Sequence, residues 1–305
     1  MAESGTALTW QIRDRRLVIE RPLVMGIVNV TPDSFSDGGR YRAVTDAVAQ
    51  VNRLIADGAD IIDIGGESTR PGSEPVGVDE ELARVGPVLE AVGRDCPVPI
   101  SIDTSKARVA RKALECGAAI VNDVTGLRGD PAMPALAAEI GVGVVVMHMR
   151  GTPQTMQLDP QYPGGVVDAV ARFFESRLHD LAAAGIPRDC VALDPGIGFG
   201  KTGEHNWELL VRLAEFRRWG RPLCLGVSRK GLLGRVVDRP AAERDPASLA
   251  VACLALAQCG PIVLRVHNVQ ATRDAVRVFE RWTAAEHSSA PAGTTPWSGP
   301  SSSPD

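Results

Sequence analysis

Residues Met25 to Arg40 read MGIVNVTPDSFSDGGR, and the change of character inside this stretch indicates the fold. Leu23 to Val30 is an almost continuous run of apolar, often branched residues, which is typical of a parallel strand covered on both faces. Thr31-Pro32-Asp33 ends that strand, and Ser34 to Gly39 is a polar segment with a Gly-Gly hinge. Since Phe35 is a large apolar residue inside this polar segment, we expect either a ligand lid or an ordinary βα loop with a helix cap.

The same unit of apolar strand, polar loop and amphipathic helix repeats along the chain. The expected strands are Leu23–Val30, Asp60–Gly65, Val98–Asp103, Ala119–Val124, Gly143–His148, Val191–Asp194, Leu223–Ser228 and Ile262–His267. The expected helices begin near Ala43, Asp79, Ser105, Pro131, Val166, Glu204, Pro246 and Ala271. This alternation predicts an α/β fold, a (β/α)₈ TIM barrel. A doubly wound sheet also alternates, but it more often has five or six strands and one Gly-rich phosphate turn after the first strand.

Three segments are expected along the chain. Residues 1–22 form an N-terminal hairpin segment, because Leu8 to Ile12 and Leu17 to Glu20 flank a polar turn at Arg13-Asp14-Arg15-Arg16. Residues 23–286 form the barrel. Residues 287–305 are Ser, Pro, Gly, Ala and Thr with almost no charge, so they cannot bury enough surface to offset their ordering entropy and should be a disordered tail.

The composition excludes several classes of protein. A formal net charge of -4 gives no global attraction to nucleic acid or to an anionic membrane. The N-terminus has no basic region followed by an apolar core, so no signal peptide is expected. The most apolar segment, Ala247 to Ala257, is too short to span a bilayer and is expected as a buried or subunit-facing helix. Six scattered cysteines without metal spacing indicate small buried side chains in a reducing cytoplasm.

Polar residues end every expected strand, and in a barrel the site lies at these carboxyl ends. The residues are Asn29, Asp63, Asp103, Asn122-Asp123, His148, Asp194, Ser228 and Arg265-His267. Asp, Asn and Ser recur at such junctions as caps, whereas Arg265 and His267 do not, and their spacing of two puts them on one side of a strand. With Lys230 they place three basic groups beside Asp63, Asp103 and Asp194. We expect a ligand with an anionic part and a polar ring.

Two loops have residues suited to binding such a ligand. In GGESTRPGSEPVG, Gly65 to Gly77, Thr69 and Arg70 are candidates for phosphate oxygens, although a surface turn held by Glu67 is the alternative. DPGIGFGKT, Asp194 to Thr202, ends like a P-loop, but proline occupies position 195, where the first glycine would fall. Its glycines would instead let the backbone approach a flat ligand, with Phe199 packing on that ligand.

The segment SIDTSK, Ser101 to Lys106, ends a buried strand on Asp103. A carboxylate at the barrel mouth can balance positive charge that develops on a substrate. The alternative is that Asp103 caps the next helix, but Thr104 and Ser105 can do this already.

Taken together, NVTPDSFSDGG, GGESTRPG, IDTSK, VNDV, DPGIGFGK, SRK and RVH occur in this order on the eight units. They resemble the dihydropteroate synthase family, over roughly Leu23 to Trp282. The resemblance implies a cytoplasmic transferase of folate biosynthesis, usually a homodimer and a sulfonamide target. It joins p-aminobenzoate to 6-hydroxymethyl-7,8-dihydropterin pyrophosphate and releases pyrophosphate and 7,8-dihydropteroate.

The resemblance also implies the site residues. Asp103, Asn122, Asp194 and Lys230 would hold the pterin, while Asn29 would bind Mg²⁺. Arg265, His267 and Thr69 would surround the pyrophosphate, and Asp103, Lys230, Arg265 and His267 would act in catalysis. The p-aminobenzoate pocket and its lid would contain Asp33, Phe35, Ser68, Arg70, Pro71, Phe199 and Lys230.

Two positions depart from the family pattern. Gly231 follows SRK where serine is frequent, so it has no hydroxyl for the benzoate carboxylate, and Asn268 follows RVH where aspartate is common. A pterin-binding paralogue without catalysis therefore remains an alternative. So does a methyltetrahydrofolate:corrinoid methyltransferase-like enzyme, although that enzyme would need neither the lid nor the Arg265-His267 pair.

Overall fold

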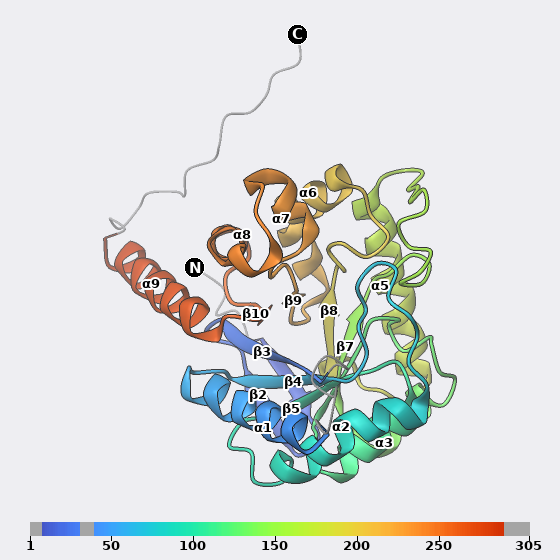
Figure 1. Ribbon diagram of the computed structural model, residues 1–305. Coiled ribbons are helices and arrows are strands. Elements are labelled where there is room, and N and C mark those ends of the chain that lie inside the picture. Colours follow the sequence, from blue (N-terminus) through green and yellow to red (C-terminus); the bar gives the residue numbers. More distant parts are fainter. Residues whose placement is uncertain (1–7, 31–39, 290–305) are drawn as a thin grey trace.

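The computed structural model describes residues 8–30 and 40–289, and their central feature is a ring of eight parallel strands with helices outside it (Figure 1). The strands are β3 (Leu23–Asn29), β4 (Ile61–Gly65), β5 (Ile100–Asp103), β6 (Ile120–Asp123), β7 (Gly143–Met147), β8 (Val191–Asp194), β9 (Cys224–Leu225) and β10 (Val263–Val266). Their order is β8-β7-β6-β5-β4-β3-β10-β9. A parallel bridge between Leu193 and Leu223 joins β8 to the start of β9 and closes the ring. The expected TIM barrel is confirmed.

The helices follow the strands, with one addition. They are α1 (Arg40–Ala56), α2 (Val78–Val92), α3 (Ala107–Glu115), α4 (Met133–Ile140), α5 (Val166–Ala183), α6 (Gly203–Val211), α7 (Gly231–Val237), α8 (Asp245–Cys259) and α9 (Val269–Ser289). Short 3₁₀ helices lie at Arg188–Cys190, Leu213–Trp219 and Ala241–Glu243. The sequence did not predict α7, a seven-residue helix whose Gly231 and Gly234 are poor helix formers.

The start of α3 differs from the expectation that Thr104 or Ser105 caps it. The helix begins at Ala107, and its first backbone N–H donates to Asp130 Oδ2 over 2.9 Å. A carboxylate from the segment after β6 therefore satisfies this helix end. A partner 23 residues away could not be read from the local sequence.

The strands alternate strictly between two apolar clusters. Met25, Ile61 and Val145 pack inside the barrel, whereas their neighbours such as Val24 and Ile62 pack against the helices. Because side chains of a strand alternate between its faces, this parity identifies which later residues of each strand point toward the barrel axis. The functional site is built from that inner set.

A hairpin of β1 (Thr9–Ile12) and β2 (Arg15–Val18) closes the end of the barrel where the strands begin. Trp10 and Ile12 are fully buried in the inner cluster, and Trp10 Nε1 donates to the carbonyl oxygen of Cys190 over 2.8 Å. The expected hairpin is present, but Arg15 and Arg16 lie in its second strand and not in the turn. The opposite, carboxyl end of the barrel is left for a ligand.

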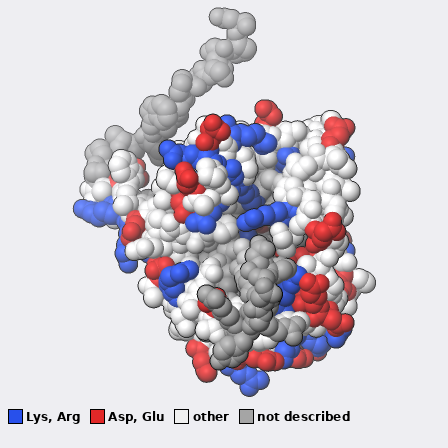
Figure 2. Space-filling model, in the orientation of Figure 1, with Lys and Arg blue, Asp and Glu red and all other residues white. Residues whose placement is uncertain are grey.

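Several other expectations concern the surface and the chain ends. Helix α9 continues to Ser289, past the expected start of the tail at residue 287, while residues 290–305 and the expected lid at 31–39 lie outside the described residues. None of the described helices combines the length and apolar character needed to cross a membrane. On the face drawn in Figure 2, the described Lys and Arg side chains are interspersed with Asp and Glu.

Candidate active site

Each strand contributes one residue to the inner face of the barrel mouth. Counting in steps of two from the buried inner cluster gives Asn29, Asp63, Asp103, Asn122, Met147, Asp194, Gly226 and Arg265. Most of this set is predicted by the polar residues at the strand ends, whereas Met147 and Gly226 are found only by counting alternate residues along each strand. Asp123 and His148 have the opposite parity and face the helix layer, so they are not part of the mouth.

The centre of the mouth is an ion-pair network around Arg265. Its Nε donates to Asp63 Oδ2 and its Nη2 to Asp103 Oδ2, each over 2.6 Å. Asn122 Nδ2 also donates to Asp63 Oδ2, over 3.1 Å. Asp63 is fully buried, and its Oδ1 has no hydrogen-bond partner among the described residues. The sequence placed Asp63 nearby without a role, and the structure shows that it holds Arg265 and Asn122 in place.

Asp103 differs from an ordinary surface carboxylate, because it is only 8% exposed. Burial raises the pKa of Asp103 to about 7; the Arg265 charge opposes this rise, whereas nearby Asp63, Glu81 and Asp123 add to it. The proton on Asp103 therefore exchanges near neutral pH, and a change in the charge around it shifts its state.

Lys230 and Phe199 form the side of the mouth near β8 and β9. Lys230 Nζ donates to the carbonyl oxygen of Ile197 and lies 4.5 Å from the centre of the Phe199 ring. Burial lowers the pKa of Lys230 to about 8, opposed by the Asp194 charge. A Cβ on Gly226 would lie 3.9 Å from both Asp194 Oδ2 and Lys230 Nζ, so the glycine keeps this part of the mouth open.

His267 is held beside Arg265 by a neighbouring strand end. Its Nδ1 lies 3.0 Å from Ser228 Oγ, and its backbone N–H donates to the same oxygen. Burial, followed by the charges of Arg229, Arg265 and Arg70, lowers the pKa of His267 to about 4. The imidazole is therefore neutral at pH 7, and it can offer a hydrogen bond but not a positive charge.

The loop of residues 67–77 is held by hydrogen bonds at its base and at its tip. Glu67 accepts from the Val76 backbone N–H over 2.9 Å and from Lys106 Nζ over 2.6 Å, so Glu67 holds this loop, as the alternative to a phosphate-binding loop predicted. At the tip, the Gly72 backbone N–H donates to the Pro153 carbonyl oxygen over 3.0 Å. Arg70 and the adjacent Pro71 are exposed, and the Arg70 charge is one of the causes that lower the pKa of His267.

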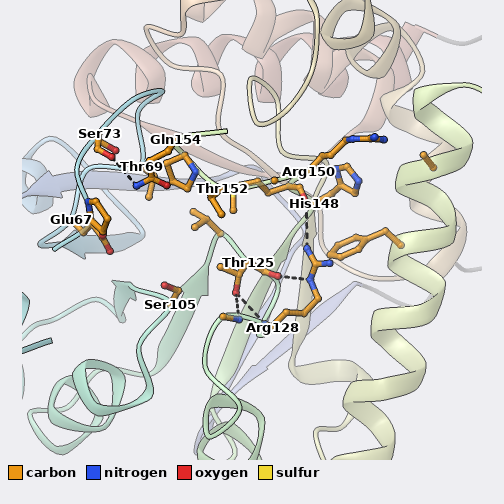
Figure 3. Close-up of a pocket in the computed structure, with 18 of the residues that line it drawn as sticks. Glu67, Thr69, Ser73, Ser105, Thr125, Arg128, His148, Arg150, Thr152 and Gln154 are labelled. Carbon is orange, nitrogen blue, oxygen red and sulfur yellow. Dashed lines mark hydrogen bonds between the residues drawn. The ribbon is translucent and has the colours of Figure 1, made fainter. Parts of the chain in front are cut away.

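Ser68 and Thr69 line a separate cavity of about 790 Å³ between this loop and the segments after β6 and β7. Figure 3 shows Thr69 on one side of the cavity and Arg128, His148 and Arg150 on the other. The inner residues of the mouth do not line this cavity. Thr69 thus lines this cavity, whose described lining does not include Arg265.

The remaining expected site residues are positioned as follows. Asn29 is exposed at the mouth end of β3, on the inner face. Asp33 and Phe35 lie outside the described residues. Gly200-Lys201-Thr202 is not a P-loop, because Lys201 is buried and Thr202 caps α6 in a capping box with His205.

The architecture and the mouth define a class of protein: a TIM-barrel enzyme whose carboxylate, amide and basic groups suit a flat polar ligand with an anionic group. Comparison with known proteins is more specific. A family profile described as pterin binding enzyme matches residues 25–267. Dihydropteroate synthase of Escherichia coli strain K12 is 47% identical over 270 residues, which cover 88% of this chain and 95% of that protein.

Solved structures agree with the sequence comparison. Yersinia pestis dihydropteroate synthase, in a sulfonamide drug complex, superposes with a TM-score of 0.85 at 41% identity, covering 90% of this chain and 99% of that one. Burkholderia cenocepacia dihydropteroate synthase, complexed with 7,8-dihydropteroate, superposes with a TM-score of 0.83 at 43% identity, covering 92% of this chain and 99% of that one. The chain belongs to the dihydropteroate synthase family of pterin-binding transferases.

Proposed function

We propose that this enzyme condenses 6-hydroxymethyl-7,8-dihydropterin pyrophosphate with p-aminobenzoate, giving 7,8-dihydropteroate and pyrophosphate. One observation carries the proposal: Asp103, Asn122 and Asp194, from three strands, face the same buried mouth beside Lys230 and Arg265. A pterin edge alternates hydrogen-bond donors and acceptors, and carboxylates, an amide and an ammonium group match such an edge. The relative that was solved with 7,8-dihydropteroate supports this choice of ligand.

The Arg265 network supports a role in binding pyrophosphate. Arg265 forms ion pairs with Asp63 and Asp103. An arriving pyrophosphate would bind the remaining N–H groups of the guanidinium, since Arg binds phosphate oxygens through a fork of N–H groups. Asp63 and Asp103 hold Arg265 in place for this contact. Neutral His267, fixed by Ser228, adds a hydrogen bond to the same anion.

The ion pair with Arg265 also prepares Asp103 for the chemical step, because the Arg265 charge favours its ionised form. The C–O bond of the pterin methylene breaks and its electron pair leaves with pyrophosphate, so positive charge develops on the methylene and the pterin ring. Asp103, kept ionised by Arg265, stabilises that charge. The lone pair of the neutral arylamine then forms the C–N bond, and the nitrogen loses a proton to solvent. We therefore favour a dissociative, SN1-like reaction.

The mouth also fits Mg²⁺ as the cofactor. The described residues contain no group of three His, Cys, Asp or Glu side chains that could hold a metal by themselves. Asn29 offers one neutral oxygen on the inner face, which suits an ion that keeps several waters and is otherwise held by phosphate oxygens. When bound, Mg²⁺ would neutralise charge on the leaving pyrophosphate.

The p-aminobenzoate pocket would lie between Phe199, Lys230 and the loop with Ser68, Arg70 and Pro71. Lys230 Nζ and the exposed Arg70 guanidinium are the cations available to a benzoate carboxylate. At Gly231, which begins α7, the backbone N–H takes the place of a serine hydroxyl. The lid residues Asp33 and Phe35 would complete the pocket and exclude water, which would otherwise hydrolyse the pterin cation.

Helix α8 supports the expected homodimer. Its exposed positions include Ala250, Cys253, Leu254 and Ala257, and Leu254 is 70% exposed. A helix that is apolar on its outward face as well as its buried face is typical of a subunit interface. All six cysteines are free thiols, which suits the cytoplasmic location we propose.

The test is release of pyrophosphate from the pterin pyrophosphate with Mg²⁺, with and without p-aminobenzoate. We expect release that depends on both, with one dihydropteroate formed for each pyrophosphate. Tight pterin binding without such release would indicate a non-catalytic paralogue.

A further inference from the structure

Lys201 is a buried lysine that the reaction does not use directly. It is 2% exposed, and its Nζ is surrounded by four acceptors. These are His148 Nδ1 at 2.9 Å and the carbonyl oxygens of Gly196 at 2.9 Å, Phe199 at 3.0 Å and His148 at 3.2 Å. An amine is costly to bury unless it is fully hydrogen-bonded, and this one meets that condition. These hydrogen bonds indicate that Lys201 holds the backbone segments around it together.

The loop of residues 195–200 needs such a fastening. Gly196 and Gly200 have φ angles of +68° and +65°, and a Cβ at either position would collide with a carbonyl oxygen, of His148 or of Arg150. The loop backbone therefore lies directly against the end of β7. Glycines lose much conformational freedom when they are ordered, so the loop requires compensating contacts. Lys201 supplies them by joining two carbonyls of the loop to His148.

The fastened loop shapes one wall of the mouth. It presents the Ile197 carbonyl oxygen, which accepts from Lys230 Nζ, and the Phe199 ring, which lies 4.5 Å from that nitrogen. The Phe199 carbonyl that Lys201 holds belongs to the same residue as this ring. A shift of the loop would therefore move the ring and the oxygen together. It would also disturb the loop contacts of Lys230 and Asp194, while Asp103 and Asn122 stay on their own strands.

We propose that Lys201 is a positioning residue for the arylamine subsite. It sets the place of Phe199 and of the Ile197 carbonyl, and through them the wall against which p-aminobenzoate binds. The inference rests on the proposed function, because it assigns this wall to p-aminobenzoate. Lys201 itself contacts no substrate.

The first experiment compares Lys201→Met, similar in shape but without donors, with Lys112→Met at the surface. For Lys201→Met we expect the KM for p-aminobenzoate to rise by at least about tenfold, since small displacements at a reacting centre are costly. The KM for the pterin pyrophosphate should rise clearly less, because Asp103 and Asn122 are untouched and only the loop contacts of Lys230 and Asp194 are disturbed. Unchanged p-aminobenzoate KM, or equal rises for both substrates, would overturn the proposal.

A second experiment asks whether Lys201 acts through Phe199. Combining Lys201→Met with Phe199→Ala should raise the p-aminobenzoate KM little beyond the larger single effect, since coupled residues are not additive. If the rise in the p-aminobenzoate KM of the double variant equals the product of the two single rises, Lys201 does not act through Phe199.

Chemical rescue covers the case in which the Met variant does not fold. Lys201→Ala leaves the space of propylamine among the same acceptors, so propylammonium should restore the p-aminobenzoate KM, whereas 1-propanol and tetramethylammonium should not. Equal effects of all three compounds would contradict the assigned hydrogen bonds. If the wild-type enzyme forms no dihydropteroate, it is the proposed function that fails; a selective KM effect requires that wild-type turnover.

Discussion

The two ends of the barrel are made by the same strands but have opposite chemistry. At the closed end, Met25 and Ile61 of these strands pack with Trp10 of the hairpin in an apolar cluster without charge. At the mouth, two to four residues further along the same inner faces, Asp63, Asp103 and Arg265 form a buried ionic network. A buried ionic network is a poor source of stability, because desolvation offsets much of its attraction. The comparison indicates that the closed end stabilises the fold, whereas the mouth is arranged for a ligand.

The largest expected effect comes from Arg265→Ala, which removes the cation shared by Asp63 and Asp103. Pyrophosphate binding and turnover should fall together, turnover by on the order of a thousandfold. Arg265→Lys is the control, because it keeps the charge but cannot bridge both carboxylates as a fork does. Steady-state kinetics and pyrophosphate titration measure these effects. Unchanged kinetics in Arg265→Ala would remove this residue from the anion site.

Trp10→Ala tests the closed end. Trp10 is fully buried, so its truncation should lower the free energy of unfolding by about 3 to 5 kcal/mol. Val18 lies in β2 and is 47% exposed, so Val18→Ala should change the free energy of unfolding by less than about 0.5 kcal/mol. Urea denaturation gives these values, and kcat at a temperature where the variant is folded should stay within about twofold of wild type. A selective loss of kcat would contradict the separation of the two ends.

Asp103→Asn keeps the shape of the side chain and removes its charge. We expect turnover to fall by on the order of a hundredfold, because the developing pterin cation loses its counter-charge. Binding of the pterin product, measured by titration, should weaken much less than turnover. A loss of less than threefold in turnover would rule out the electrostatic role.

The sequence was sufficient for the parts of the fold that repeat. Apolar runs such as Leu23 to Val30 identify strands by themselves, and their alternation with helices predicts the barrel. Contacts between distant segments were out of reach. Asp130 caps α3 from another loop, and the short, glycine-containing α7 has no periodicity to reveal it.

For the site, the polar residues at the strand ends do not show by themselves which side chains point into the barrel and which point toward the helices. The polar residues at the strand ends include the inward-facing Asp103 and Asp194, but they also include Asp123 and His148, which face the helix layer. Met147 and Gly226 escaped notice because neither is charged, although both occupy inner positions. The neutral state of His267 and the pairing of Arg265 with two carboxylates depend on burial and on distances across the barrel. A single sequence contains neither quantity.

The pH dependence of kcat/KM tests the electrostatics of the mouth. Burial raises the pKa of Asp103 to about 7, so lowering the pH below that value protonates the carboxylate and activity should fall by about tenfold per unit. Burial lowers the pKa of Lys230 to about 8, so activity should fall again as this ammonium loses its proton at higher pH. The expected profile is a bell with its maximum between the two values. Asp103→Asn should abolish the acid limb alone, and an acid limb that survives would assign it to another group.

The smallest effect is expected from Gly231→Ser, at the first residue of α7. A Cβ there meets no atom within 4 Å, so the serine should fit without strain. Its hydroxyl would add one hydrogen bond to the benzoate carboxylate, lowering the KM for p-aminobenzoate by about three- to tenfold. Gly231→Ala is the matched control, because it adds the Cβ without the hydroxyl. If both variants change the KM equally, the effect belongs to the helix start, and the backbone N–H of Gly231 already suffices for the carboxylate.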